Sequence, residues 1–134
     1  MHLPLNILLI DDDNINNFLT KELFSLHNCD IKISAAQSVP EALYHLNNTI
    51  FSKERLPDVI LLDINMPVTE GWEFIEAFEK LDPIFTGHVD LYIYTSSEYH
   101  KDIERAKSYA SVKQILLKPI SAEMIEEICK VNGQ

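Results

Sequence analysis

The sequence predicts an α/β fold: a doubly wound parallel sheet of five strands in the flavodoxin-like order 2-1-3-4-5, with helices on both faces. Five short runs rich in β-branched and aliphatic residues alternate with stretches of helical period, as consecutive βαβ units do. Most of these runs are apolar throughout, as expected for parallel strands covered on both faces. A length of 134 residues suits one ordinary domain, so we expect residues 1–134 to form a single domain.

The five expected strands are separated by the helical stretches. They are residues 7–10, 31–35, 59–62, 89–94 and 112–117. The first expected helix follows the first strand, and we expect the face that carries its large apolar side chains to pack on the sheet. Those side chains are Ile15, Phe18, Leu19, Leu23 and Leu26.

End signals mark the second and the last helix. Ser38 followed by Pro40 and Glu41 is typical of a capped helix start with proline in the first turn. Ser121 is expected to cap the last helix, and Glu123 suits its dipole. The core-facing positions expected in the later helices are Ala42, Leu43 and Leu46, then Phe74, Ile75, Phe78 and Leu81, then Tyr99, Ile103, Ala106 and Ala110, and finally Met124, Ile125, Ile128 and Val131. Residues 47–57 and 82–88 are expected loops.

Composition and charge argue against several classes of function. Lys and Arg number 11 and Asp and Glu 21, and the net charge of −10 would repel nucleic acid and anionic membranes. The first residues have neither the basic segment nor the long apolar run of a signal peptide or membrane span, so a cytoplasmic location is expected. Cys29 and Cys129 are expected to be small core or near-surface residues, with neither a zinc site nor a disulfide framework. The 5 histidines share no metal-ligand spacing.

Polar side chains follow four of the expected strands at their carboxyl ends. Taken singly, they have ordinary structural explanations: Asp13 as a helix N-cap, Thr95 as a β-branched strand residue and Lys118 as a solvated charge. The complete set is Asp11, Asp12 and Asp13 after the first strand, Asp63 after the third, Thr95, Ser96 and Ser97 after the fourth, and Lys118 after the fifth.

The expected strand order makes the ends of strands one and three neighbours, so Asp11, Asp12 and Asp63 should lie together. Two carboxylates ~4 Å apart repel by roughly 4 kcal/mol at an effective dielectric constant near 20, a large part of a domain's roughly 5–15 kcal/mol of stability. A cation is therefore expected there, and carboxylate oxygens at an open edge suit Mg²⁺. A calcium-loop template starting at Asp11 fails, because Ile15 and Asn16 occupy a ligand position and the obligatory glycine position.

The hydroxyl of Thr95 and the ammonium of Lys118 would complete a site for a phosphoryl group attached to Asp63. Four segments carry this pattern: residues 10–13, residues 58–67 followed by Gly71, residues 94–96, and residues 117–119. In this combination and order the sequence resembles the receiver domains of response regulators, over about residues 4–131.

The resemblance implies that Asp63 accepts a phosphoryl group from a phosphohistidine on a sensor histidine kinase or phosphotransfer protein. It implies that Mg²⁺ is held by Asp11, Asp12, Asp63 and the backbone carbonyl of Asn65. Thr95 and Lys118 would act on the phosphoryl group, and the chain would take part in its own phosphorylation and dephosphorylation without being an enzyme. By the same resemblance, the Lys118–Pro119 bond would be cis, Met66, Pro67 and Gly71 would shape the turn after the acceptor, and Asn65 and Ser97 would tune dephosphorylation.

One position departs from the family pattern: Ile115 occupies the usual place of a Tyr or Phe three residues before the lysine. Tyr94 adjoins Thr95 in the strand and should point to the opposite face, so it cannot replace that aromatic residue. We therefore expect Thr95 to move toward the phosphoryl group with only small repacking at Ile115. As a stand-alone receiver the chain would signal by contact with a downstream protein or by self-association, and the residues expected to form that contact are Tyr99, Ile103 and Tyr109.

Three alternatives compete with this interpretation. A phosphohydrolase of the haloacid-dehalogenase type would use the Asp-x-Asp of residues 11–13, but it would leave Asp63 idle and needs an acidic cluster after Lys118. A receiver-shaped interaction module that never carries phosphate should lack the acceptor, an acid or the lysine, and none is missing. A flavodoxin is disfavoured because the first loop offers three carboxylates where a flavin phosphate needs hydroxyls and amides.

Overall fold

The computed structural model describes residues 3–66, 71–96 and 100–131, and it contains a parallel sheet of five strands in the order β2-β1-β3-β4-β5. The predicted fold class and strand order are confirmed. Two strands match the prediction residue for residue, and the others differ by two residues at most. The strands are β1 (Leu5–Ile10), β2 (Ile31–Ala36), β3 (Val59–Leu62), β4 (Asp90–Thr95) and β5 (Val112–Leu117).

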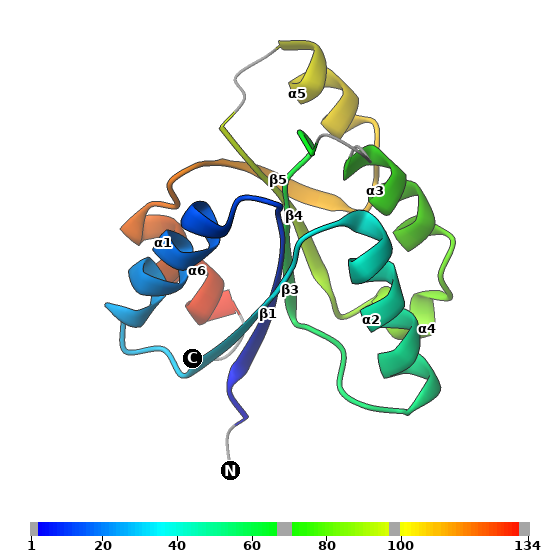
Figure 1. Cartoon of the computed structure of the whole chain (residues 1–134), viewed down its shortest axis with the longest axis horizontal. Coiled ribbons are helices and arrows are strands. Elements are labelled where there is room, and N and C mark those ends of the chain that lie inside the picture. Colours follow the sequence, from blue (N-terminus) through cyan, green and yellow to red (C-terminus); the bar gives the residue numbers. More distant parts are fainter. Residues whose placement is uncertain (1–2, 67–70, 97–99, 132–134) are drawn as a thin grey trace.

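Helices cover both faces of the sheet (Figure 1). They are α1 (Asn14–Ser25), α2 (Val39–Phe51), α3 (Gly71–Glu79), α4 (Pro83–Thr86), α5 (His100–Lys107) and α6 (Ala122–Val131). One core cluster joins the sheet to α1 and α6, and the other joins it to α2, α3 and α5. None of the described helices has the length and apolar character needed to cross a bilayer.

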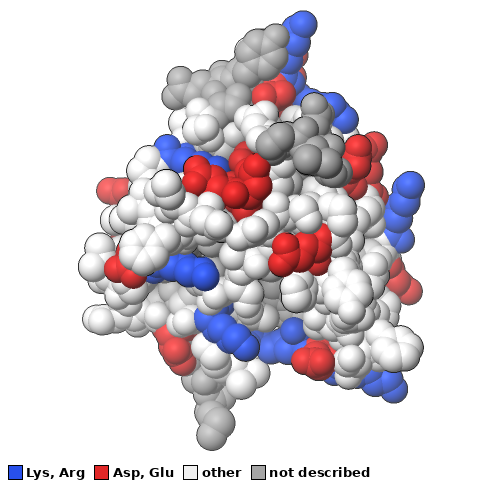
Figure 2. Space-filling view, in the orientation of Figure 1, with Lys and Arg blue, Asp and Glu red and all other residues white. Residues whose placement is uncertain are grey.

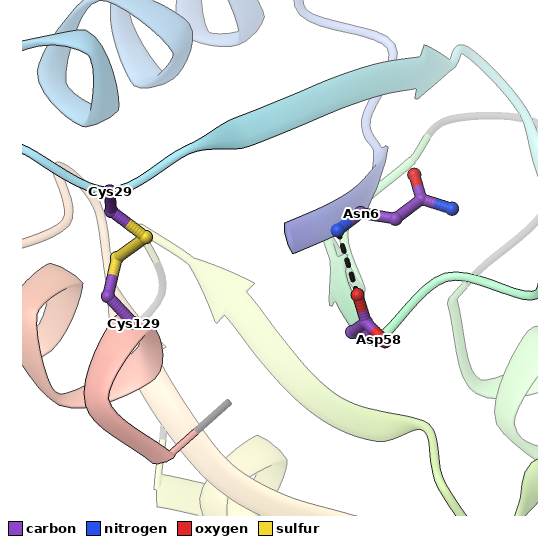
Figure 3. Close-up of a disulfide and its surroundings, with 4 residues drawn as sticks. All are labelled: Asn6, Cys29, Asp58 and Cys129. Atoms are coloured by element: carbon purple, nitrogen blue, oxygen red, sulfur yellow. Dashed lines mark hydrogen bonds between the residues drawn. A yellow bond between two sulfur atoms is a disulfide. The ribbon is translucent and has the colours of Figure 1, made fainter. Parts of the chain in front are cut away.

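The strand register brings the carboxyl ends of the strands to one edge of the sheet. Ile10 of β1 pairs with Leu62 of β3, and the amide of Asp63 donates to the carbonyl of Ile10 at 2.9 Å. At the amino end, the amide of Asn6 donates to Asp58 Oδ2 at 2.9 Å, which fixes the same pair of strands (Figure 3). The residues that follow β1 and β3 therefore emerge side by side.

The predicted packing face of α1 is wrong. Ile15 and Phe18 are 81% and 66% exposed, and Leu19 and Leu26 are exposed as well. The buried residues of α1 are Asn17, Thr20 and Phe24. Hydrogen bonds offset part of the cost of burying the two polar residues: Thr20 Oγ1 lies 3.0 Å from the Tyr94 hydroxyl, and Asn17 Nδ2 donates to the carbonyl of Asp11 at 3.1 Å. The side-chain oxygen of Asn17 is buried without a hydrogen-bond partner in the part of the chain that the structure describes. Four of the five predicted packing residues consequently face solvent, and only Leu23 packs against the core.

The two predicted helix caps are confirmed, but several predicted helix ends are wrong. Ser38 Oγ accepts the amide of Glu41 at 3.1 Å and Ser121 Oγ accepts that of Met124 at 3.1 Å, so both predicted caps are present. α2 continues to Phe51, inside a predicted loop, and it ends where the amide of Ser52 donates to the carbonyl of Asn48 at 2.9 Å. A short helix, α4, replaces the other predicted loop, since Asp82 caps it and proline opens it. α5 ends before Ala110, and Tyr99 lies outside the described residues.

The two cysteines form a disulfide, which corrects the prediction that they are unpaired. Cys29 precedes β2, and Cys129 lies on α6, 100 residues later in the sequence (Figure 3). Their Cα atoms are 6.1 Å apart, within the range that a disulfide spans. The bond fastens the last helix to the loop between α1 and β2, at the edge opposite the carboxyl ends of the strands.

Candidate functional site

Three carboxylates meet where β1 and β3 end. Asp11, Asp12 and Asp63 each offer an oxygen, and these oxygens lie within 4.8 Å of one another. Asp11 and Asp63 are 2% and 7% exposed, whereas Asp12 is exposed to solvent. Figure 2 shows acidic side chains gathered near the start of α1, over this end of the sheet. The cluster is thus open on one side and buried on the other.

Asp11 is the most heavily bonded of the three carboxylates. Its Oδ1 accepts the amide of Asp13 at 2.9 Å. Its Oδ2 accepts Nδ2 of Asn16 at 3.0 Å and Nζ of Lys118 at 2.5 Å. Asp13 caps α1, because its side chain accepts the amides of Ile15 and Asn16. The structural role anticipated for Asp13 is therefore present, and α1 begins at the site.

Lys118 bridges two of the acids. Its Nζ lies 2.5 Å from Asp11 Oδ2 and 3.4 Å from Asp63 Oδ2. Burial alone would lower the pKa of this ammonium, but the hydrogen bond to Asp11 and the charge of Asp63 outweigh burial and raise the pKa above its ordinary value. Lys118 therefore stays charged at neutral pH. The Lys118–Pro119 peptide bond is cis, as the resemblance implies.

Asp63 follows β3 and is held by the turn after it. The amide of Asn65 donates to Asp63 Oδ1 at 3.0 Å, and Asn65 Nδ2 donates to Thr95 Oγ1 at 3.3 Å. Burial raises the pKa of the Asp63 carboxyl and the Asp11 charge raises it further, while the Asn65 amide and Lys118 act in the opposite direction without cancelling the effect. The ionised carboxylate is thus less stable here than in water.

The raised pKa predicts how stability depends on pH in metal-free solution. Between the carboxyl's ordinary pKa of about 4 and the raised value in the fold, the folded chain binds more protons than the unfolded chain, so Asp63 contributes a loss of stability as the pH rises. Asp63→Asn should therefore melt at a higher temperature than the native chain at pH 7 in EDTA, with a gain that shrinks as the pH falls toward 4. Thermal melts of both proteins across that range test this, and a native chain that is the more stable one at pH 7 would contradict it.

The donor atoms fit a hard divalent cation. The cluster contains only oxygen ligands, two of them from nearly buried carboxylates whose other contacts fix their orientation. Hard oxygen donors suit Mg²⁺, Mn²⁺ and Ca²⁺ better than softer metals. A cation would also stabilise the Asp63 carboxylate, whose pKa is raised by burial and, to a lesser degree, by the Asp11 charge.

Gly71 begins α3 directly against the backbone of Asp63. A β carbon at this position would lie 2.5 Å from the Asp63 carbonyl oxygen and 2.8 Å from Ile64 Cα, both of which are backbone atoms. Trp72 follows and stacks on Tyr109, with ring centroids 6.0 Å apart, while the Arg105 guanidinium lies 4.6 Å from the centre of its ring. The turn after Asp63 is thus in contact with α3, and α3 with the α5 region.

The predicted site residues largely come together. The sequence predictions missed Asn16 and Asn17, which bond to Asp11 from the first turn of α1, because no sequence motif marks either residue. Ser97 and Pro67 lie outside the described residues. The predicted residues that the structure gathers at this edge are Asp11, Asp12, Asp63, Asn65, Thr95 and Lys118.

Ile115 and Tyr94 lie on opposite sides of the sheet, as the alternation of strand side chains predicts. Ile115 is partly buried against the core beneath α2, α3 and α5. The Tyr94 hydroxyl lies 3.1 Å from the amide of Ile120, and the ring packs with α1 and α6. Ile103 and Ile115 line an apolar hollow of about 630 Å³ between α5 and β5.

Comparisons with known proteins agree with this geometry. The family model described as "Response regulator receiver domain" matches residues 7–130. A two-component response regulator from Cytophaga hutchinsonii is similar in structure, with a TM-score of 0.85, 28% sequence identity and 95% coverage of both chains.

Two curated relatives are longer than this chain. A hybrid signal transduction histidine kinase from Dictyostelium discoideum is 27% identical over 98% of this chain, which spans 7% of that protein. A two-component response regulator from Oryza sativa subsp. indica is 24% identical over 94% of this chain, which spans 54% of that protein. The family match covers far more than half of the chain, and the acidic edge lies where the fold places it, so the chain belongs to the response regulator receiver domain family.

Proposed function

We propose that this chain is a single receiver domain that accepts a phosphoryl group on Asp63 and passes the signal on by protein contact. The observation that carries the proposal is the position of the Lys118 ammonium, 2.5 Å from Asp11 and 3.4 Å from Asp63, beside an exposed Asp12. A partly buried lysine paired with two acids at an open edge is poised to bind a third anionic group. The donor would be a phosphohistidine of a sensor histidine kinase or phosphotransfer protein.

In the proposed phosphoryl transfer, the protein mainly positions the reacting groups and neutralises charge. An oxygen of the Asp63 carboxylate would attack the phosphorus, an O–P bond would form, and the P–N bond to the donor imidazole would break with the electron pair going to nitrogen. Lys118 would neutralise charge on the phosphoryl oxygens, and the Thr95 hydroxyl would donate to one of them. Hydrolysis of the acyl phosphate by water would later return Asp63, so the chain would take part in both steps without acting on another substrate.

Asp11, Asp12, Asp63 and the backbone carbonyl of Asn65 are proposed to hold Mg²⁺. When bound, the ion supplies charge neutralisation for the transferred group. The support is a set of oxygen ligands within 4.8 Å of one another and the raised pKa of Asp63, which reflects the burial of its carboxylate and the nearby Asp11 charge.

The donor protein must cover the open edge at Asp63, and α1 lies next to it. Ile15 and Phe18 present exposed apolar area there, which suits contact with a partner. For the output we propose the region of Ile103, where an apolar hollow adjoins β5, and self-association through the same region is the alternative. Because ATP-dependent kinases would supply the phosphohistidine, the proposed location is the cytoplasm.

Intact-mass measurement after incubation with acetyl phosphate and Mg²⁺ tests the proposal. The native chain should gain about 80 Da, the mass of one phosphoryl group, and the addition should be labile to base and hydroxylamine as an acyl phosphate is. Asp63→Ala should gain nothing, because it lacks the acceptor oxygen. Omission of Mg²⁺ should suppress the addition.

Asp82→Asn serves as the matched control, because Asp82 is an exposed helix cap on α4 whose side chain accepts the amide of Ile84, away from the acidic cluster. This variant should be phosphorylated like the native chain. A native chain that gains no mass would instead favour an interaction module without phosphate chemistry. Multiple turnovers of p-nitrophenyl phosphate that survive Asp63→Ala but not Asp11→Ala would favour a phosphohydrolase.

A further inference from the structure

Asn16 reaches into the acidic cluster from the first turn of α1. Its Nδ2 donates to Asp11 Oδ2 at 3.0 Å, and its own amide is bound by the N-cap Asp13 at 3.1 Å. The side chain is therefore attached to a capped helix end, and it touches the carboxylate that lies deepest in the site. The neighbouring residue, Asn17, binds the backbone of Asp11: Asn17 Nδ2 donates to the Asp11 carbonyl at 3.1 Å.

Three donors thus fix the Asp11 carboxylate, and they differ in charge. The amide of Asp13 and the side-chain amide of Asn16 are neutral, whereas the third donor is the ammonium of Lys118. The ammonium and the Asn16 amide share Oδ2, while the Asp13 amide occupies Oδ1. Loss of either Oδ2 donor leaves the other to hold that oxygen.

Lys118 is the donor that the proposed function removes from Asp11. A phosphoryl group on Asp63 brings new anionic oxygens to an ammonium that already lies 3.4 Å from Asp63 Oδ2. A divalent cation held by the acids would at the same time repel that ammonium, since both are positive. Neutral amides are not repelled in this way. Asn16 would then be the remaining side-chain donor that the described structure shows on Asp11 Oδ2.

We propose that Asn16 is a positioning residue that keeps the Asp11 carboxylate in its metal-binding orientation once a bound cation repels Lys118 from Asp11 or a phosphoryl group attracts it. The proposal rests on the proposed function, and it adds a residue that the acidic, hydroxyl and lysine positions do not include. A terminal carboxylate torsion is broad and easily rotated, so a fixed donor on each oxygen limits its freedom. Partners that orient a metal ligand in this way typically change metal affinity by about 10–100-fold when they are removed.

The test is the binding of Mg²⁺ to the unphosphorylated chain, measured by isothermal titration calorimetry. Asn16→Ala should raise the Kd for Mg²⁺ about 10-fold, because the bound cation repels the Lys118 ammonium and Asn16 is then the side-chain donor left on Asp11 Oδ2. The thermal melting temperature in EDTA should change by only a few degrees, because the Asn16 side chain is only half-buried. Asn14→Ala is the matched control: Asn14 lies in the same turn but accepts its hydrogen bond from Gln37 Nε2, so Mg²⁺ affinity should stay native.

A second pair of variants separates positioning from a general loosening of the helix. In a Lys118→Met background, Asn16→Ala should still weaken Mg²⁺ binding by at least the same factor, because Asn16 is then the side-chain donor left on Asp11. A native Kd for Asn16→Ala, or an effect that disappears in the Lys118→Met background, would overturn the positioning role. A native chain that does not bind Mg²⁺ at all would overturn the metal site of the proposed function and this inference together, so the two failures are distinguishable.

Discussion

Replacing both Cys29 and Cys129 with serine is expected to lower the free energy of unfolding by about 2–5 kcal/mol. The disulfide joins residues 100 positions apart, and a crosslink that closes so long a loop removes much of the freedom of the unfolded chain. A domain of this size is stable by roughly 5–15 kcal/mol, so the loss is a large fraction of the total. Urea unfolding of the oxidised native chain and of the double variant measures it.

Each single serine variant should lose as much stability as the double variant, because either one breaks the same bond. Dithiothreitol should destabilise the native chain toward the double variant and leave the double variant unchanged. The bond lies at the edge of the sheet opposite Asp63, so phosphorylation by acetyl phosphate should survive its loss under folding conditions. Equal stability of native and double-variant chains would contradict the expectation.

Gly71→Ala is expected to damage both the fold and the site. The added β carbon would meet two backbone atoms at 2.5 and 2.8 Å, so either the start of α3 or the turn after Asp63 must move. Crowding of this kind costs about 1–3 kcal/mol. Because the displaced atoms include the Asp63 carbonyl, we also expect the rate of phosphorylation by acetyl phosphate to fall by roughly 10- to 100-fold, as misplacement of a reacting group does.

Quenched phosphorylation time courses and urea unfolding check the two effects separately. Glu76→Ala is the matched control, since Glu76 is exposed on the same helix and its truncation adds no contact with Asp63. It should phosphorylate at the native rate. A Gly71→Ala chain that is phosphorylated as fast as the native chain would show that the backbone of Asp63 tolerates the added methyl group.

The sheet could be predicted from the sequence because apolar runs bounded by polar residues define buried strands. β3 (Val59–Leu62) is such a run, and its predicted bounds agree with the structure residue for residue. The packing face of α1 could not be predicted in this way. Hydropathy favoured Ile15 and Phe18 over Asn17 and Thr20, but the buried polar residues are compensated by partners such as Tyr94, 74 residues from Thr20 in the sequence. Hydrogen bonds over that distance leave no local pattern.

The expected sheet order predicted which functional residues meet, because it determines which strands have neighbouring carboxyl ends. The proximity of Asp11 and Asp63 therefore follows from the expected sheet order 2-1-3-4-5, which the structure confirms. The bonds among these residues do not, since the bridging position of Lys118 and the reach of Asn16 depend on rotamers within the folded site. The pairing of Cys29 with Cys129 was missed because it also depends on the folded structure. The two cysteines become neighbours only when α6 packs on the sheet.

The stack that joins α3 to the α5 region has an optical consequence. The chain contains a single tryptophan, Trp72, so all of its indole fluorescence comes from this side chain. The ring stacks on Tyr109, and the Arg105 guanidinium lies over it. It directly follows Gly71, whose position is set by the backbone of Asp63. The chain thus carries a built-in fluorophore, free of any label, whose brightness reports whether an event in the acidic pocket reaches the helix beyond it.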